Sequence, residues 1–173
     1  PDINELHNKE MFKMFWNEAA HQGIVLRTSK LFQPSLEEFI DDSKKNKSNI
    51  VVMLDQVTDP NNIGSIMRSC ALFNCKTVIV SNDNAPDITA TMAKAASGAL
   101  ETVNYISVVN LSRAMIQFKK NDYWIYGFDS NEENNQNKNL DLPNKCVLVF
   151  GSEGKGLRNL TKNECDSLVS IPI

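Results

Sequence analysis

Short apolar runs alternate with helix-like segments from residue 50 onward, and this alternation constrains the fold more than any other feature of the chain. Strands joined through helices usually pair in parallel, with helices on both sides of the sheet. The sequence therefore predicts an α/β fold, a mostly parallel sheet with helices on both faces. Runs rich in β-branched and aromatic residues place the strands at 50–54, 77–80, 103–107, 123–128, 146–150 and 168–171.

Apolar residues recur at helical spacing between these runs. The first stripe consists of Ile63, Ile66, Met67, Cys70 and Ala71, and the second of Leu111, Ala114, Met115 and Phe118. Asn110 is a good N-cap for the second helix. An Ala-rich segment, 87–97, predicts a weaker helix that stops at Gly98. The asparagine-rich segment 129–144 predicts a solvated loop.

Residues before 50 form a separate part of the chain. A helix is predicted over 5–20, a short strand over 24–26 and a short helix over 36–42, and the polar run 41–49 is a plausible linker. We place a boundary near residue 48, so that 1–48 and 49–173 are distinct.

The composition excludes several classes of protein. With 42% hydrophobic residues, 23% charged residues and a net charge of −3, the chain is neither disordered nor fibrous, and its surface is not broadly basic. Its apolar runs fall short of the roughly 18–20 residues of a membrane span. Residues 1–9 do not resemble an export signal, and the absence of an initiator Met suggests that the chain starts within a longer one.

The cysteines give no sign of a metal or redox site. Cys70, Cys75, Cys146 and Cys165 form no CxxC pair and have no histidine at zinc-finger spacing. We expect buried thiols, no bound metal and a reducing cytoplasmic location.

The first segment whose residues could form a functional site is 54–68, which runs from a predicted strand through a turn into a helix. Ligands of open α/β sheets bind beyond the carboxyl ends of the strands. Arg68 falls outside the apolar stripe of this helix, and Asn62 lies near its start, where backbone N–H groups are free. Together they predict an anion site suited to a phosphate. Alternatively, Asn62 only caps the helix, Gly64 only permits close packing and Arg68 is solvated.

The second such segment, 149–157, follows another apolar strand. Gly151, Gly154 and Gly156 let the backbone approach a ligand and expose its N–H groups. The spacing matches neither a P-loop nor GxGxxG. The alternative is a flexible turn before a short helix capped by Thr161 and Glu164.

A third segment, 94–101, places small residues at a helix-to-strand junction, where packing is the favoured explanation.

Four motifs follow one another along the chain: Asp59-Pro60-x-Asn62-x-Gly64-x-x-x-Arg68, Ser97-Gly98-Ala99, Gly151-Ser152-Glu153-Gly154-x-Gly156 and Ile171-Pro172. Their order and spacing resemble the SpoU/TrmH family of RNA ribose 2′-O-methyltransferases in the SPOUT superfamily. Ahead of them, His21-Gln22-Gly23 is similar to the subgroup that methylates a guanosine ribose in 23S ribosomal RNA.

This resemblance implies a trefoil knot in the complete chain, a homodimer, S-adenosylmethionine as cofactor and structured RNA as substrate, with ribosomal RNA preferred over transfer RNA. Residues 1–48 would be the tail of an N-terminal substrate-binding domain plus a linker. Arg68 would be the principal catalytic residue, assisted by Asn62 and Glu153. The cofactor would contact Phe150, Gly151, Gly154, Gly156 and Ile171.

The sequence departs from the family pattern in two places. It ends at Ile173, before the Ser-Leu-Asn motif that completes the knot, so the chain is either truncated or an inactive remnant. Asn74 stands where the family often has Gly. The alternatives to a ribosomal RNA methyltransferase are a non-catalytic RNA-binding module, a transfer RNA ribose methyltransferase and, less consistent with the glycine spacing, a nucleotide-phosphate-binding protein.

Overall fold

The structure is a computed structural model that describes residues 31–83, 85–129 and 141–170 together with a few isolated positions nearer the N-terminus. The chain divides into two compact units, Pro1–Leu31 and Phe32–Ile173, and the second contains all the elements below. The predicted helix over 5–20 and strand over 24–26 lie outside the described residues, as do His21-Gln22-Gly23 and most of the loop 129–144.

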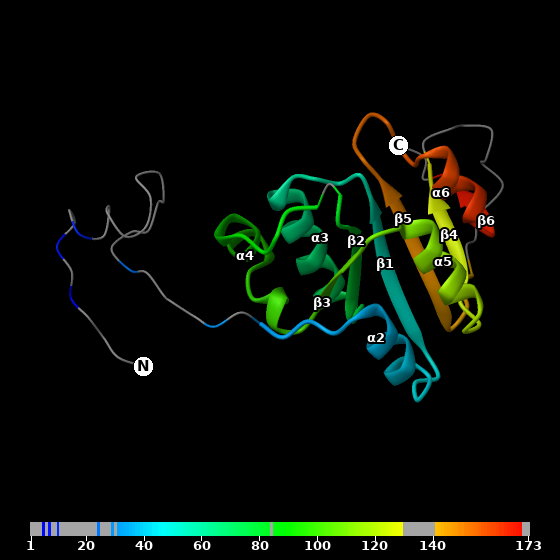
Figure 1. Ribbon diagram of the computed structural model, residues 1–173, viewed down its shortest axis with the longest axis horizontal. Helices are drawn as coiled ribbons and strands as arrows, with labels where there is room; N and C mark the ends of the chain where they lie inside the picture. The colour runs from blue at the N-terminus through cyan, green and yellow to red at the C-terminus, as the bar shows by residue number, and fades with distance from the viewer. Residues whose placement is uncertain are drawn as a thin grey trace. The chain divides into compact units, whose positions relative to one another are not determined.

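The core of the second unit is one sheet in the order β3-β2-β1-β5-β4-β6, in which every pairing is parallel (Figure 1). The predicted parallel sheet is therefore confirmed, with strand ends that lie within two residues of the sequence prediction. The strands are β1 (Asn49–Asp55), β2 (Thr77–Ser81), β3 (Asn104–Val108), β4 (Trp124–Phe128), β5 (Lys145–Gly151) and β6 (Ser167–Val169).

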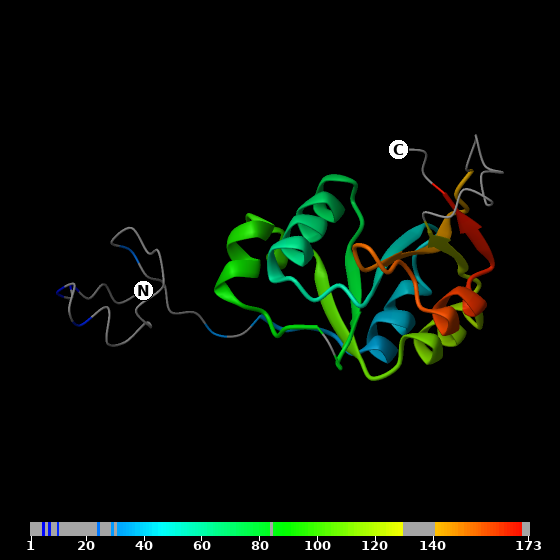
Figure 2. The same ribbon diagram turned by 90° about the horizontal axis from the view of Figure 1, so that it is seen from above.

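Helices cover both faces of the sheet, as predicted (Figure 2). One face packs against α2 (Leu36–Ser43) and α5 (Leu111–Lys119), with α6 (Asn159–Glu164) beside α5. The other face packs against α3 (Pro60–Leu72), α4 (Ala90–Ala96) and the short 3-10 helix η1 (Ala99–Glu101). Asn110 caps α5 as expected, because its side chain accepts a 2.9 Å hydrogen bond from the Arg113 N–H.

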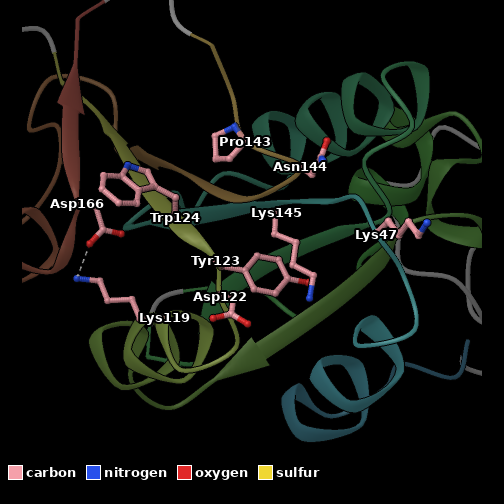
Figure 3. A pocket seen from close by; sticks show the side chains of 9 residues that line it. All are labelled: Lys47, Lys119, Asp122, Tyr123, Trp124, Pro143, Asn144, Lys145 and Asp166. Carbon is pink, nitrogen blue, oxygen red and sulfur yellow. Dashed lines mark ion pairs between the residues drawn. The ribbon is translucent and has the colours of Figure 1, made fainter.

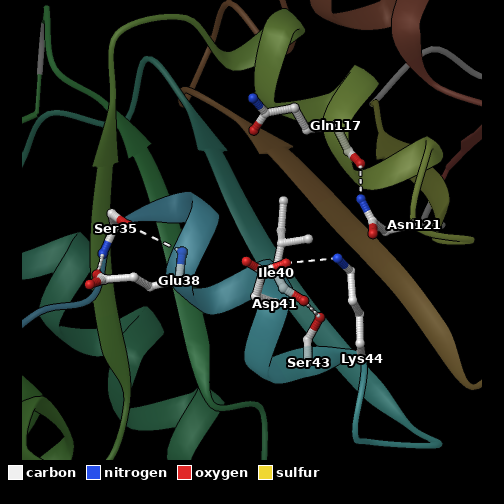
Figure 4. Close-up of polar contacts among 8 residues, drawn as sticks. All are labelled: Ser35, Glu38, Ile40, Asp41, Ser43, Lys44, Gln117 and Asn121. Atoms are coloured by element: carbon white, nitrogen blue, oxygen red, sulfur yellow. Dashed lines mark hydrogen bonds and ion pairs between the residues drawn. The ribbon is translucent and has the colours of Figure 1, made fainter.

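Helix α2 belongs to the same core as the strands. Ser35 and Glu38 form a capping box at its start, and Lys44 pairs with Asp41 at its end (Figure 4). Phe39 packs on Phe118 of α5, with ring centroids 6.2 Å apart. The assignment of 1–48 to a neighbouring domain stays a prediction.

The packing of α3 on α4 depends on one glycine. A Cβ at Gly64 would lie 2.6 Å from the Met92 carbonyl oxygen and 2.7 Å from the Ala95 Cβ. Helix α4 begins three residues later than predicted because Thr89 accepts from the Met92 N–H and caps it. It ends where Ser97 and Gly98 adopt positive φ, so segment 94–101 makes a tight junction, in line with the packing explanation.

Asn74, the departure from the family pattern, has φ +56°. Asparagine is among the few non-glycine residues that adopt this left-handed conformation readily. The substitution therefore keeps the turn between α3 and β2.

No helix within the described ranges has both the length and the apolar character that a membrane span needs. The same ranges hold no group of three or more His, Cys, Asp or Glu side chains placed to bind a metal ion.

We expect Gly64→Ala to lower the free energy of unfolding by about 1–3 kcal/mol, because the new methyl group meets backbone atoms of α4 that cannot move aside. Urea denaturation measures the change. Ser65→Ala, at the exposed neighbouring position, is the control and should stay within about 0.5 kcal/mol of the original chain. Equal stability of the two variants would contradict the close packing of α3 and α4.

The thiols generate a second prediction. Cys146 is fully buried, and burial raises its pKa from the ordinary 9.0 to about 11. Since only the thiolate is nucleophilic, Cys146 should resist brief alkylation by iodoacetamide at pH 8 in the folded protein and react in urea. The stabilising effect of the neutral thiol is complete below pH 9 and is lost as the pH rises through about 11. Peptide mass mapping gives the result; rapid labelling of the folded chain would refute it.

Candidate active site

The two segments singled out in the sequence start at the same edge of the sheet. They are 54–68, which contains Arg68, and 149–157, which contains three glycines. Strands β1 and β5 are parallel neighbours, and their register places Leu54 opposite Phe150 and Asp55 opposite Gly151. The chain leaves β1 toward α3 and leaves β5 toward α6 from adjacent points (Figure 1). Sequence positions almost a hundred residues apart therefore meet beyond the carboxyl ends of the two central strands.

Helix α3 begins earlier than its apolar stripe suggested. Asp59 is the N-cap, accepting from the Asn61 N–H at 3.1 Å, and Pro60 occupies the first turn. The alternative in which Asn62 caps the helix is therefore wrong. The proline explains the early start, because its fixed φ suits the first helical position and it has no N–H to leave unpaired.

This start also changes the position of Arg68 relative to the helix end. Arg68 lies in the third turn, about 12 Å along the axis from Pro60. Its exposed side chain leaves α3 about 120° around the axis from that of Asn62, which is also exposed. The two side chains therefore leave α3 from different turns and in different directions, and only Asn62 lies in the first turn.

The loop after β5 folds back on itself. Ser152 and Gly156 form a bridge in which the Gly156 N–H donates to the Ser152 carbonyl at 2.9 Å. A Cβ at Gly151 would lie 2.1 Å from the carbonyl carbon of Gly156, so only glycine fits there. Gly154 has φ +82° and open space around it, and Glu153 is exposed beside it. The N-cap of α6 is Arg158, whose side chain makes no capping hydrogen bond. Thr161 is buried within the helix and does not precede it, so the predicted Thr161–Glu164 capping box is wrong.

Two buried carboxylates anchor the segment that follows this loop. Asp55, completely buried, accepts from the Arg158 Nε–H at 2.7 Å and from the Arg158 backbone N–H at 3.0 Å. Asp129, directly after β4, forms an ion pair with Lys162. No motif of the sequence predicted either pair. The available signal was an acidic residue directly after an apolar strand, which has to find a partner if it is buried.

Aromatic rings lie next to the loop at the same edge of the sheet. Phe128 and Phe150, opposite each other on β4 and β5, stack with centroids 4.6 Å apart and planes 11° from parallel. Both rings are partly exposed. Ile171, the remaining residue of the expected cofactor site, lies outside the described residues.

Two pockets lie apart from this edge. The larger, of about 630 Å³, is at the amino ends of β4 and β5 and is lined by Trp124 and by the ion pair Lys119–Asp166 (Figure 3). The smaller, of about 220 Å³, lies between α2 and α5. Asn62, Arg68 and Glu153 line neither of them.

The fold is shared with RNA methyltransferases of the TrmH family, among them a putative RNA methyltransferase of Porphyromonas gingivalis with a TM-score of 0.66 and 26% sequence identity over 73% of this chain and 51% of that one. Residues 49–173 match the model of the SpoU rRNA Methylase family, so the chain belongs to this family. It is 36% identical to the 23S rRNA (guanosine-2′-O-)-methyltransferase RlmB of Vibrio vulnificus over 90% of this chain and 62% of that protein. With RlmB of Salmonella typhi it shares 34% identity over 99% of this chain and 70% of that one.

A solved structure shows the same fold. The SpoU methyltransferase AviRb of Streptomyces viridochromogenes, in complex with AdoMet, has a TM-score of 0.66 and 25% sequence identity to this chain, covering 74% of this chain and 50% of AviRb. The chain spans 62% and 70% of the two RlmB proteins and 44% of an uncharacterized tRNA/rRNA methyltransferase of Synechocystis to which it is 34% identical over 99% of its own length.

Alanine substitutions at two glycines of the loop should destabilise the protein to different degrees. Gly151→Ala should lower the free energy of unfolding by about 2–3 kcal/mol, because the methyl group overlaps backbone atoms of Gly156. In Gly154→Ala the new methyl group meets no atom of the described residues. The free energy of unfolding should therefore fall by only about 1 kcal/mol, because alanine disfavours the positive φ at this position. Urea titrations of the two variants decide, and a Gly154 variant as unstable as the Gly151 variant would be inconsistent with the folded-back loop.

Proposed function

We propose that this chain is the catalytic part of an enzyme that transfers a methyl group from S-adenosylmethionine to a ribose 2′-hydroxyl of structured RNA, with ribosomal RNA as substrate. The observation that carries the proposal is the β1–β5 register, which brings the Arg68 helix and the Glu153 loop to one edge of the sheet. The family and the RlmB relatives support the reaction and the RNA class. By the same analogy the protein works in the cytoplasm as a homodimer.

The residues at this edge fit S-adenosylmethionine. The open space at Gly154 leaves room for a ligand against the backbone, and the stacked rings of Phe128 and Phe150 offer a partly exposed apolar surface where the loop begins. Gly151 shapes the loop, and the backbone of Gly154 and Gly156 would provide polar contacts. AviRb, which shares the fold, was solved with this cofactor. The bound cofactor supplies a methyl group that is already electrophilic because it is attached to a sulfonium.

The protein therefore has to position the hydroxyl and assist its loss of a proton. A guanidinium keeps its proton in proteins, so Arg68 acts as a fixed positive charge and not as a base. Its place in the third turn of α3, exposed and outside the core, suits contact with the phosphate next to the target ribose and with the negative charge that develops on the ribose oxygen. Glu153 provides a carboxylate that orients Asn62 or Arg68, or accepts the hydroxyl proton.

Arg68→Ala in the full-length protein should reduce methyl transfer at least ~100-fold, because removal of one preorganised charge at the reacting oxygen has effects of that order. The assay is incorporation of radiolabelled methyl groups into a ribosomal RNA transcript, with circular dichroism to check the fold. Arg113→Ala, which removes an exposed arginine of α5, is the matched control and should retain activity. Full activity of the Arg68 variant would overturn the assignment of the site.

Two further measurements separate the alternatives. Calorimetric titration with S-adenosylmethionine distinguishes an enzyme from an RNA-binding module, which would show no binding. Parallel assays on ribosomal and transfer RNA transcripts identify the RNA class, and preferential methylation of the transfer RNA would refute the ribosomal assignment.

A further inference from the structure

One residue, Asp55, contacts both the entry and the exit of the glycine loop. The backbone of Asp55 pairs with Gly151, where the loop begins, and the side chain of Asp55 binds Arg158, where the loop ends. The loop 152–157 is thereby closed on the last residue of β1. Both carboxylate oxygens are used, one by a backbone N–H and one by a guanidinium N–H, so the path of the chain and the direction of the Arg158 side chain are fixed together.

The same residue leads into the other half of the candidate site. Gln56, which follows Asp55, has φ +63°, and the chain then turns through Asp59 into α3. Asp55 is thus the point at which the Arg68 helix and the Glu153 loop are connected.

Stability alone does not account well for a charge at this position. Asp55 is completely buried, whereas its partner Arg158 has half of its side chain exposed. Removing a carboxylate from water is costly, and buried ion pairs are often no more stabilising than apolar residues of the same size. Such a pair is better suited to specifying one geometry, because a displaced loop would leave the carboxylate buried without a partner.

We propose that Asp55 and Arg158 are positioning residues that hold the glycine loop in its cofactor-binding form against the Arg68 helix. The inference rests on the proposed function and deepens it: neither residue touches the reacting atoms, and the pair acts through the loop that it closes.

The informative variant is Arg158→Lys in the full-length protein. Lysine keeps the charge and the backbone N–H bond to Asp55 but cannot reproduce the Nε–H geometry. We expect KM for S-adenosylmethionine to rise about tenfold, with KM for RNA unchanged. Arg158→Ala should raise KM for S-adenosylmethionine further, so that lysine partly restores cofactor binding relative to alanine. Arg113→Lys, the matched control, should behave as the unmodified protein.

Hydrogen exchange provides a readout that does not depend on activity. The Gly156 N–H, which donates to the Ser152 carbonyl, should exchange about tenfold faster in Arg158→Lys, while amides in the middle of β1 and β5 stay protected. A purely structural pair would instead loosen the whole sheet or leave the loop unchanged, and either result would overturn the inference.

The outcomes separate this inference from the proposed function. If the unmodified protein binds S-adenosylmethionine and methylates RNA, but Arg158→Lys alters neither the cofactor KM nor the exchange of the loop, the positioning role alone fails. If the unmodified protein shows no binding and no transfer, the proposed function fails. In that case faster exchange confined to the loop would still show that the pair holds it, and unchanged exchange would refute this as well.

Discussion

The parallel pairing of β1 with β5 is the constraint on which the rest of the site depends. Each strand has neighbours on both sides, and the central residues of both are buried except Leu148, which is partly buried. A shift of register by one residue would turn every buried side chain to the opposite face, so the alignment is strongly specified. Its consequence is that Asp55 lies opposite Gly151, which brings two loops of distant sequence to one edge. Their proximity thus follows from packing in the core and needs no contact between the loops themselves.

Flexible and fixed components are combined at this edge. Glycine gives a loop the conformations that it needs but does not select one of them. Buried carboxylates select strongly, because a displaced partner leaves a buried charge with less compensation. Asp55, at the end of β1, binds Arg158 directly before α6, and Asp129, directly after β4, binds Lys162 in the last turn of α6. The glycines allow the fold of the loop, and the ion pairs restrict it to one arrangement.

The sequence was sufficient for the sheet but not for the details of the site. Strands were located within one or two residues because continuous apolar runs identify buried strands. The start of α3 was missed because the stripe beginning at Ile63 marks the buried face and not the first turn, whose signal was Asp59-Pro60. The Asp55–Arg158 pair joins positions 103 residues apart, and no local pattern encodes such a contact. The catalytic roles of Asn62, Arg68 and Glu153, the cofactor contact of Ile171 and the knot stay predictions.

The glycines of the loop do not share one role, although the motif presents them as a set. A side chain at Gly151 would overlap the backbone of Gly156, so the first glycine is required by the fold of the loop itself, with or without a ligand. Among the described residues, a Cβ at Gly154 would meet no atom within 4 Å, and a Cβ at Gly156 would meet the Asp129 side chain, at 3.2 Å. Among the described residues the loop is therefore open at Gly154, whereas Asp129 closely approaches it at Gly156. The first glycine contributes indirectly, because it allows the loop to close on Asp55 and so sets where the other two are presented.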